Sequence, residues 1–273
     1  MKLLVEKFRS FYVVVLDTYH RYKSINTTAV LIYTMGKVGS SDISKKLKLS
    51  FQFHNFDQEI PAKNFSSRFT PHIYRYVVEA LRWKILGRKL LRVFGLPAAE
   101  LKVISIVRDP VARNLSAFFQ NLDESQVIGG SVSESEFYAY TNHMLPLVWF
   151  DVEFKRHLGV DVYAYPFDVE AGWCVIEKEG FKILILQLEE LSNLGEIVAD
   201  FVGDDKVYLG GAKQNFSGDK WYGVLYSDLK AKIDISDEYL NLMYKSRFMK
   251  HFYGDEKTAR MRAKWTQRDS SES

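Results

Sequence analysis

The sequence predicts an α/β protein in which a central parallel sheet is flanked by helices on both faces. Two apolar runs, at residues 29–33 and 102–107, are continuous rather than alternating, which is typical of parallel strands covered on both sides. Each run leads through a short turn into a helical pattern, and alternating strands and helices favour right-handed crossovers within one sheet. The 273 residues, 47% of them apolar, suffice for one large domain with a substantial core.

The other elements follow from periodicity and from turn residues. Helices are expected at residues 1–23, 40–49, 71–94, 133–157, 191–201, 223–233 and 236–253. Strands are expected at residues 50–54, 162–165, 172–176 and 181–186, with a turn joining the last two. Residues 255–273 are charged and Ser-rich, and we expect a partly disordered tail there.

A glycine-rich loop follows the first strand and reads Thr34-Met35-Gly36-Lys37-Val38-Gly39-Ser40-Ser41. A tight turn between a strand and a helix directs backbone N–H groups and the positive helix end at an anion. The loop is P-loop-like, but a Walker A loop places its Lys directly before Ser or Thr. Here Val38 and Gly39 separate Lys37 from Ser40, so the order is Lys-x-Gly-Ser-Ser.

A second candidate phosphate site follows the strand at 102–107. Arg108 ends that strand, Pro110 suits the first position of a helix, and Ser116 lies eight residues beyond Arg108. A guanidinium can hold a phosphate with two parallel hydrogen bonds, and a hydroxyl can add a third. Ligands of parallel sheets bind outside the carboxyl ends of the strands, so the two loops together suit a ligand with a phosphate-like group at each end.

A third segment reads Lys213-Gln214-Asn215-Phe216-Ser217-Gly218-Asp219-Lys220-Trp221-Tyr222. With it, the chain resembles sulfotransferases: the first loop resembles their 5′-phosphosulfate loop, and Arg108 with Ser116 resembles their 3′-phosphate site. The Lys-x-Asn-x4-Lys-Trp pattern is similar to that of tyrosyl-protein sulfotransferases. The segment, with residues 149–154 and 161–168, also resembles a bacterial family of capsular polysaccharide synthesis proteins with an Asn-Lys-Trp-Tyr-Ser motif, although Gly223 stands where that motif has Ser.

The resemblance, which extends over about residues 29–253, implies a single domain with the sulfotransferase fold at 29–254. The helical spacing of apolar and basic residues predicts that a basic amphipathic helix at 1–28 precedes this domain and packs on it. It implies transfer of a sulfuryl group from 3′-phosphoadenosine 5′-phosphosulfate (PAPS) to an acceptor hydroxyl of a carbohydrate or capsular polysaccharide, without a metal. The product nucleotide would be 3′-phosphoadenosine 5′-phosphate (PAP). Lys37 would be the catalytic cation on the bridging oxygen. The implied cofactor-binding residues are Gly36, Lys37, Val38, Gly39, Ser40, Ser41, Arg108, Ser116, Lys213, Asn215, Lys220 and Trp221.

The candidate general base is His54, at the end of the strand predicted for residues 50–54. That position lies on the same sheet edge as both loops, and an imidazole can accept a proton near neutral pH. A histidine that only caps its strand is an equally weighted alternative. His72 is a weaker candidate, and four carboxylates could orient His54 or replace it: Asp57, Glu59, Glu153 and Asp168.

Composition narrows the function classes. A net charge of +3 gives no reason to expect a nucleic-acid partner. A single cysteine, Cys174, excludes an intramolecular disulfide, and one Cys with six scattered His offers no Cys/His metal site. No segment reaches the ~18 consecutive apolar residues of a membrane span. Together with the resemblance, which implies a bacterial enzyme, these features lead us to expect a soluble protein in the cytoplasm, with peripheral contact to the inner membrane surface as a further option.

The stretch from Arg82 to Arg92 carries five basic residues and no acidic one. It is compatible with a solvated helix face, with a contact to an anionic glycan or polyphosphate-linked acceptor, or with an anionic membrane surface.

Two other functions remain open from the sequence. One is a non-catalytic nucleotide-binding protein of polysaccharide assembly. The other, less favoured, is a nucleotide-dependent kinase, for which the loop lacks the Lys-[Ser/Thr] pair.

Overall fold

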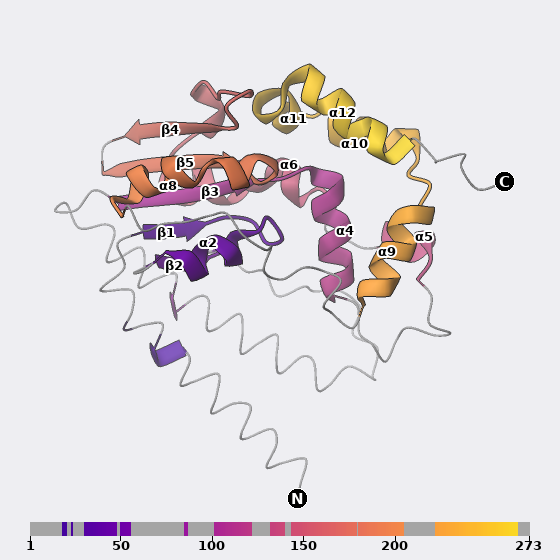
Figure 1. Cartoon of the computed structure of the whole chain (residues 1–273), viewed down its shortest axis with the longest axis horizontal. Helices are drawn as coiled ribbons and strands as arrows, with labels where there is room; N and C mark the ends of the chain where they lie inside the picture. Colours follow the sequence, from indigo (N-terminus) through magenta and orange to yellow (C-terminus); the bar gives the residue numbers. More distant parts are fainter. Residues whose placement is uncertain are drawn as a thin grey trace, which may run out of the picture.

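The computed structural model describes residues 18–20, 23, 30–47, 50–55, 85–86, 101–121, 132–139, 143–178, 180–204 and 222–266. Within these residues the chain forms an α/β structure built on one five-stranded sheet (Figure 1). The strands are β1 (Val30–Tyr33), β2 (Ser50–Phe53), β3 (Leu101–Val107), β4 (Trp173–Lys178) and β5 (Phe181–Gln187), in the order β2-β1-β3-β5-β4. The first three and β5 run parallel, and β4 is an antiparallel edge strand, so the sheet is mostly rather than wholly parallel.

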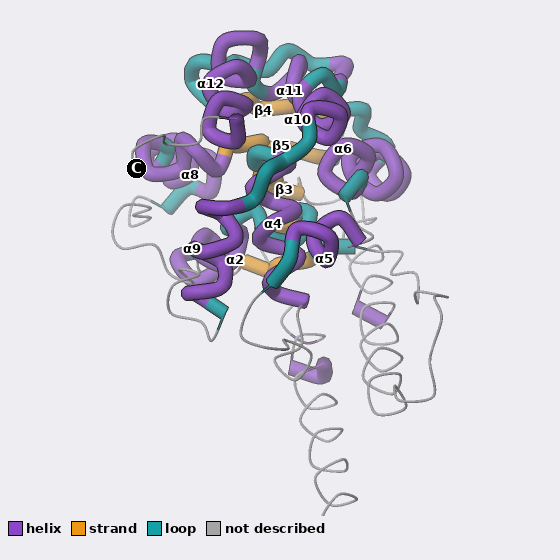
Figure 2. Tube along the Cα trace, turned by 90° about the vertical axis from the view of Figure 1, so that its right-hand side faces the viewer, coloured by secondary structure: helices purple, strands orange, loops and turns teal. Residues whose placement is uncertain are grey.

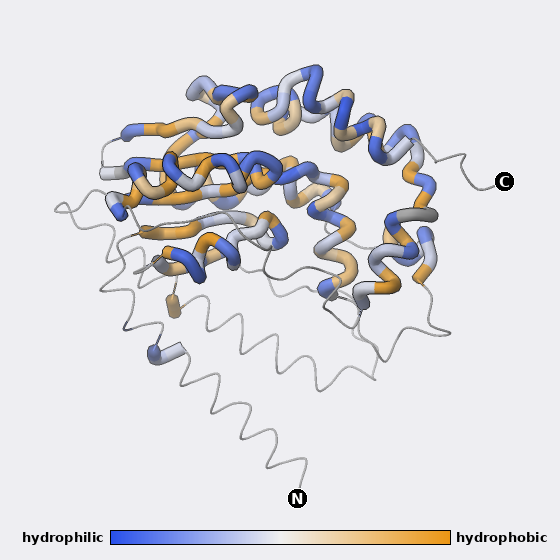
Figure 3. Tube along the Cα trace, viewed as in Figure 1, coloured by the Kyte–Doolittle hydropathy of each residue, from blue (hydrophilic) through white to orange (hydrophobic). Residues whose placement is uncertain are grey.

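The central strands are apolar because both of their faces are covered. All four residues of β1 are buried, and so are six of the seven in β3. Figure 3 shows these strands as a hydrophobic layer between more polar helices. Helix α8 (Gly195–Val202) lies on one side of the sheet and α6 (Leu145–Trp149) on the other (Figure 2). The predicted fold class is therefore confirmed, and the two apolar runs named first are its central strands.

Several predicted helices form close to their expected limits. They are α2 (Ser40–Lys46), α9 (Gly223–Lys232) and α8, which follows the 3-10 helix η6 (Leu188–Asn193). Helix α4 (Pro110–Asn121) begins at Pro110, as expected.

The single helix predicted for residues 133–157 is wrong, because the chain there is broken into pieces. They are α5 (Glu134–Ala139), α6, the π-helix η4 (Phe150–Lys155) and α7 (Arg156–Leu158). Pro146 lies in the first turn of α6, where its missing N–H does no harm, so a new helix begins there.

The strand predicted at 162–165 is also wrong. Residues Val162–Ala164 form the 3-10 helix η5, because the Asp161 carboxylate accepts a hydrogen bond from the Tyr163 N–H and starts a turn. The helix predicted at 236–253 is two helices, α10 (Asp237–Tyr244) and α11 (Arg247–Phe252). Ser246 lies between them, and its hydroxyl caps α11 by accepting from Met249 N–H.

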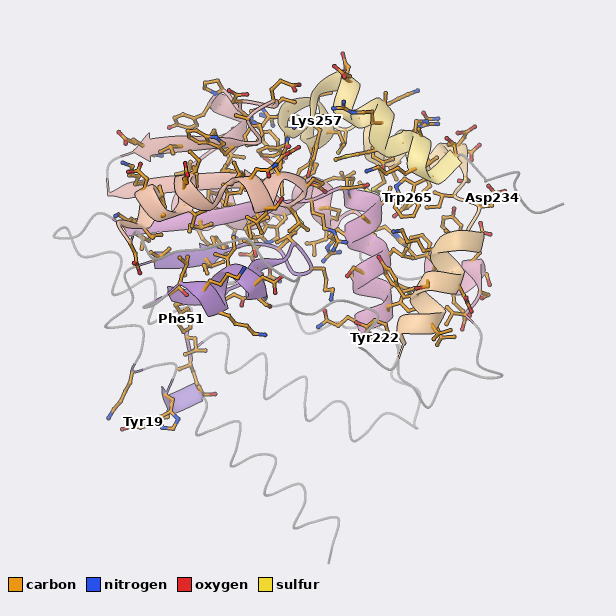
Figure 4. All side chains as sticks on the ribbon, viewed as in Figure 1. Tyr19, Phe51, Tyr222, Asp234, Lys257 and Trp265 are labelled. Atoms are coloured by element: carbon orange, nitrogen blue, oxygen red, sulfur yellow. The ribbon has the colours of Figure 1, made fainter. Side chains whose placement is uncertain are left out.

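The sequence did not predict helix α12 (Gly254–Thr266), which occupies most of the expected tail. It is fastened by Lys257, labelled in Figure 4, whose ammonium group donates to three acceptors. These are Val169 O at 2.6 Å, Gln187 Oε1 at 3.0 Å and Glu190 Oε1 at 3.2 Å. A charged segment can pack against a domain when its buried charge is paired in this way.

Some predictions lie outside the described residues. These are most of residues 1–28, the helix at 71–94 with nearly all of the stretch from Arg82 to Arg92, the segment from Lys213 to Trp221, and residues 267–273. Among the residues that are described, no helix is long and apolar enough to cross a membrane.

Candidate functional site

The two predicted phosphate loops leave neighbouring parallel strands at the same edge of the sheet. β1 pairs with β3; the loop at 34–39 directly follows β1, and Arg108 directly follows β3. Arg108 reaches across, and its Nη1 donates a hydrogen bond to the Lys37 carbonyl oxygen at 2.7 Å. One side chain therefore joins the two loops that the sequence placed 71 residues apart.

The first loop has unusual backbone geometry. Lys37 has φ 72°, the only positive φ at a non-glycine position among the described residues, and Gly39 has φ 77°. The positive φ favours glycine at position 39, and a Cβ atom there would also lie 2.5 Å from Leu188 Cδ1, so that the leucine side chain would have to move. A Cβ atom at Gly36 would meet nothing within 4 Å, so the loop faces open space at that residue.

Two arginines hold two successive carbonyls of this loop. Besides the Arg108 bond to Lys37, Arg113 donates from Nε to the Gly36 carbonyl oxygen at 3.1 Å. In a trans peptide the C=O and the next N–H point in opposite directions. The N–H groups of Lys37 and Val38 therefore point away from the arginines. Successive N–H groups turned to one side make a concavity that suits an anion.

The second loop differs from the sequence expectation. The Asp109 carboxylate accepts from the N–H groups of Val111 at 2.9 Å and Ala112 at 3.4 Å, so it occupies the start of α4 itself. The expectation that free N–H groups of this helix face an anion is wrong. Only side chains remain for a ligand: Arg108 is half-buried, and Ser116 lies on a partly exposed stripe of α4.

A second carboxylate lies next to Asp109. Glu189 is exposed as a residue, but its carboxylate turns inward, accepting from Asp109 N–H at 2.9 Å and Tyr253 OH at 2.9 Å. Burial raises the pKa of Asp109 and of Glu189, whereas their hydrogen bonds oppose that rise. Asp109 also accepts from Tyr244 OH at 3.0 Å. These hydrogen bonds connect Tyr244 of α10 and Tyr253, directly after α11, to the residues that follow β3 and β5.

His54 lies directly after β2 and is tied to the first loop. Its Nδ1 is 2.8 Å from the Thr34 carbonyl oxygen, which can only accept, so Nδ1 carries the proton. Its Nε2 is then the acceptor, 3.2 Å from the Gln52 side-chain nitrogen, and that nitrogen also donates to Ser40 Oγ at 2.7 Å. The ring is therefore held at the loop with the unprotonated nitrogen on the side of Ser40.

Two of the carboxylates that could replace His54 as the base, Glu153 and Asp168, are described, and each has hydrogen-bond partners of its own. Glu153 is buried and accepts from Tyr33 OH at 2.6 Å, with His157 Nε2 3.6 Å away. Asp168 is exposed and accepts from the N–H of Ala171 within its own turn. His72, Asp57 and Glu59 lie outside the described residues.

The third segment leads into α9 beside the second loop. Tyr222, at the start of α9, packs against Phe119 of α4 with ring centroids 5.8 Å apart, and Tyr226 does so at 5.2 Å. Figure 4 shows Tyr222 near the C-terminal end of α4 and Trp265 near its N-terminal end. Burial raises the pKa of Tyr226, whereas its hydrogen bond to Arg108 acts the other way. Helix α9, which follows the third segment, is thus brought to Arg108 through Tyr226.

Three residues of this region were missed by the sequence analysis: Arg113, Gln52 and Tyr226. Arg113 could have been noticed, because it lies one turn into a helix in which most residues are apolar. An arginine that such a helix buries is almost always paired with an acceptor. Gln52 and Tyr226 have none, since a polar residue in an edge strand and a tyrosine in a helix are ordinary.

A family model matches residues 140–254, and its description is "Putative capsular polysaccharide synthesis protein". The match covers less than half of the chain. It includes α6, β4, β5 and α9 but neither Lys37 nor Arg108, so the similarity is narrower than the stretch from residue 29 that the motifs suggested. No curated protein and no solved structure shows a significant match. Within the part of the chain that is described, no group of three or more His, Cys, Asp and Glu could hold a metal ion.

Proposed function

We propose that the chain is a PAPS-dependent sulfotransferase whose acceptor is a hydroxyl group of a carbohydrate or capsular polysaccharide. The observation that carries the proposal is the bond between Arg108 and the Lys37 carbonyl, because it unites two anion-type loops on adjacent strands. The open space at Gly36 and the N–H groups turned away from the arginines fit the 5′-phosphosulfate end of PAPS. The similarity of residues 140–254 to the capsular polysaccharide family supports a glycan acceptor.

Each residue has a role that follows from its place. The acceptor oxygen attacks sulfur while the bond from sulfur to the phosphate oxygen breaks, so negative charge grows on that phosphate. Lys37 and the loop N–H groups stabilise this charge, an electrostatic contribution that is largest in the transition state. Arg108, with donors beyond the one bound to Lys37, and Ser116 hold the 3′-phosphate.

His54 takes the proton of the acceptor hydroxyl in this proposal. Its Nε2 has the lone pair, and the amide of Gln52 must rotate away to let the acceptor reach it. The Nδ1–H bond to the Thr34 carbonyl then keeps the ring oriented while the second nitrogen becomes protonated.

Calorimetry with three nucleotides tests the cofactor assignment. We expect PAP to bind with micromolar or tighter affinity whether or not Mg2+ is present, and AMP, which lacks the 3′-phosphate, to bind far more weakly. Equal affinity for PAP and AMP would remove the 3′-phosphate site. A Mg2+-dependent preference for ATP would instead support the kinase alternative.

A non-catalytic nucleotide-binding protein is the second candidate, because both ring nitrogens of His54 are engaged within the protein. It would bind PAP as above but transfer no labelled sulfate from PAPS to any glycan in an acceptor panel. Transfer to one acceptor class excludes it.

A further inference from the structure

Arg113 is a buried arginine that bonds to the first loop but was not among the residues predicted to bind the cofactor. It lies on α4, five residues beyond Arg108, and only 4% of its surface is exposed. Its Nε donates to Gly36 O at 3.1 Å and its Nη1 to Asn114 Oδ1 at 3.1 Å. Burying a guanidinium is costly unless it is hydrogen bonded, so these contacts account for its position.

We propose that Arg113 is a positioning residue that holds the loop at residues 34–41 in its anion-binding conformation without touching the nucleotide. The inference rests on the proposed function, because it takes this loop to bind the 5′-phosphosulfate. It goes further by giving different roles to the two arginines near the start of α4. Arg108 contacts both the ligand and the loop, whereas Arg113 contacts the loop and not the ligand.

The physical reason lies in the Gly36 carbonyl. Its oxygen carries partial negative charge and would repel an anion if it turned into the loop. The bond from Arg113 turns this oxygen toward α4, and the N–H of Lys37 in the same peptide consequently points the other way. Lys37 has φ 72°, a conformation that non-glycine residues keep only when their surroundings impose it. Arg113 and Arg108 hold the peptides on either side of Lys37.

The guanidinium is in turn fixed by a buried chain of hydrogen bonds. Asn114, which is fully buried, donates from Nδ2 to His143 O at 2.8 Å and to Tyr239 OH at 3.0 Å. His143 Nε2 is 2.9 Å from the Phe137 carbonyl oxygen, so this nitrogen carries the proton, and Tyr239 OH donates to Nδ1 at 2.7 Å. Through these hydrogen bonds the loop is connected to Tyr239 of α10 and to His143 in the turn before α6.

These hydrogen bonds also connect residues 140–254, which match the family model, with the part of the molecule that precedes them. His143 and Tyr239 lie within residues 140–254, the range that matches the family model, and the loop lies outside it. Packing within the matched part therefore sets the geometry of a loop that the match does not include.

Two arginine variants, Arg113→Lys and Arg108→Ala, separate positioning from binding in calorimetric titrations with PAP and AMP. Arg113→Lys should weaken both nucleotides about equally, by about tenfold, the scale of one charge-assisted hydrogen bond. The ratio of PAP to AMP affinity should stay at the wild-type value. Arg108→Ala should lower that ratio, because it removes the 3′-phosphate contact. Far-UV circular dichroism and thermal unfolding check that each variant is folded.

Hydrogen–deuterium exchange supplies a readout that needs no nucleotide. In Arg113→Lys the amides of residues 34–41 should exchange faster than in wild type, whereas those of α12 should not change. Tyr239→Phe, which removes only the hydroxyl between Asn114 and His143, should give a smaller effect of the same kind, about two- to fivefold in affinity.

The outcomes are distinguishable. Unchanged affinities together with unchanged exchange in the loop would overturn the role of Arg113. A loss confined to PAP would also overturn it, because Arg113 would then be a 3′-phosphate ligand. If wild type binds neither nucleotide, the proposed function fails by itself, and the exchange rates still decide whether Arg113 positions the loop.

Discussion

The β1–α2 and β3–α4 units are both a strand, a tight turn and a helix, yet they offer an anion different chemistry. At the start of α2 stands Gly39, which gives no side-chain cap, and in the preceding loop the N–H groups of Lys37 and Val38 point away from Arg108 and Arg113. At the start of α4 stands Asp109, whose carboxylate occupies the first N–H groups of its own helix. The first unit therefore offers an anion backbone N–H groups, whereas the second offers only side chains.

The difference teaches that a strand–turn–helix pattern does not by itself make an anion site. The residue at the helix start decides, because a carboxylate there satisfies the N–H groups that a phosphate would otherwise use. In this protein the second unit gives up its backbone site, and its arginines hold the loop of the first. In the proposed function, the two units then form one site rather than two equivalent ones.

The largest effect is expected at His54, which belongs to the first unit through its bond to Thr34. In His54→Ala, turnover of PAPS should fall by roughly 10²–10⁴, the usual cost of losing a general base. PAP affinity should change little, because His54 lies in neither phosphate loop. Gln52→Ala serves as a comparison, because it removes the Gln52 contacts to His54 Nε2 and to Ser40 Oγ but keeps the Nδ1 bond to Thr34 that orients the ring. Turnover of His54→Ala within a few-fold of wild type would eliminate His54 as the base.

The next effect concerns the side-chain site of the second unit. Arg108→Ala should weaken PAP binding by roughly 2–4 kcal/mol, the order expected when a charge-assisted bidentate contact is lost. AMP should lose less, because only the bond to Lys37 is removed from its site. Ser116→Ala should give a smaller loss, also specific to PAP. Equal losses for PAP and AMP in Arg108→Ala would mean that Arg108 only supports the first loop.

Two glycine variants sharpen the contrast within the first unit. Gly39→Ala should lower the free energy of unfolding by about 1–3 kcal/mol, since φ is 77° and the new Cβ meets Leu188. Gly36→Ala should change it by less than about 0.5 kcal/mol, because the added methyl group meets nothing within 4 Å. The same methyl group should nevertheless weaken PAP binding. If Gly36→Ala binds PAP as wild type does, the open space at Gly36 is not part of the site.

The smallest effect is expected from the carboxylate that caps α4. Burial raises the pKa of Asp109 above its ordinary value of 3.8, so the native state holds this proton more strongly than the unfolded state does. The stability contribution of Asp109 is therefore full below about pH 4 and is lost as the pH rises through the native pKa. Asp109→Asn keeps the Oδ1 acceptor and removes the titration.

Urea unfolding of Asp109→Asn and wild type at several pH values between about 4 and 7 measures this difference. The free energy of unfolding of the variant, relative to wild type, should increase with pH. A relative stability that falls as the pH rises would show that the charged form of Asp109 is the favoured one. The second unit would then owe its stability to the negative charge at its helix start.

Much of the fold could be predicted because it depends on local patterns. Continuous apolar runs identified β1 and β3, and the Glu177-to-Gly180 turn identified the β4–β5 hairpin. The errors have a common cause, since each wrongly predicted element has a residue whose local hydrogen bonding the hydrophobic pattern does not register. Pro146 and Ser246 start new helices within the two predicted ones, and Asp161 starts a 3-10 turn where a strand was predicted.

By itself the sequence determined the α/β class, the order of the motifs and the location of both loops at strand ends, because residue spacing and burial periodicity encode these features. Only the tertiary structure decided what the loops present. The carbonyls of Gly36 and Lys37 are turned by arginines 77 and 71 residues away, and the orientation of His54 depends on a carbonyl 20 residues before it. Such contacts depend on side-chain directions at the sheet edge, which follow from the packing of several elements and leave no local pattern in the chain.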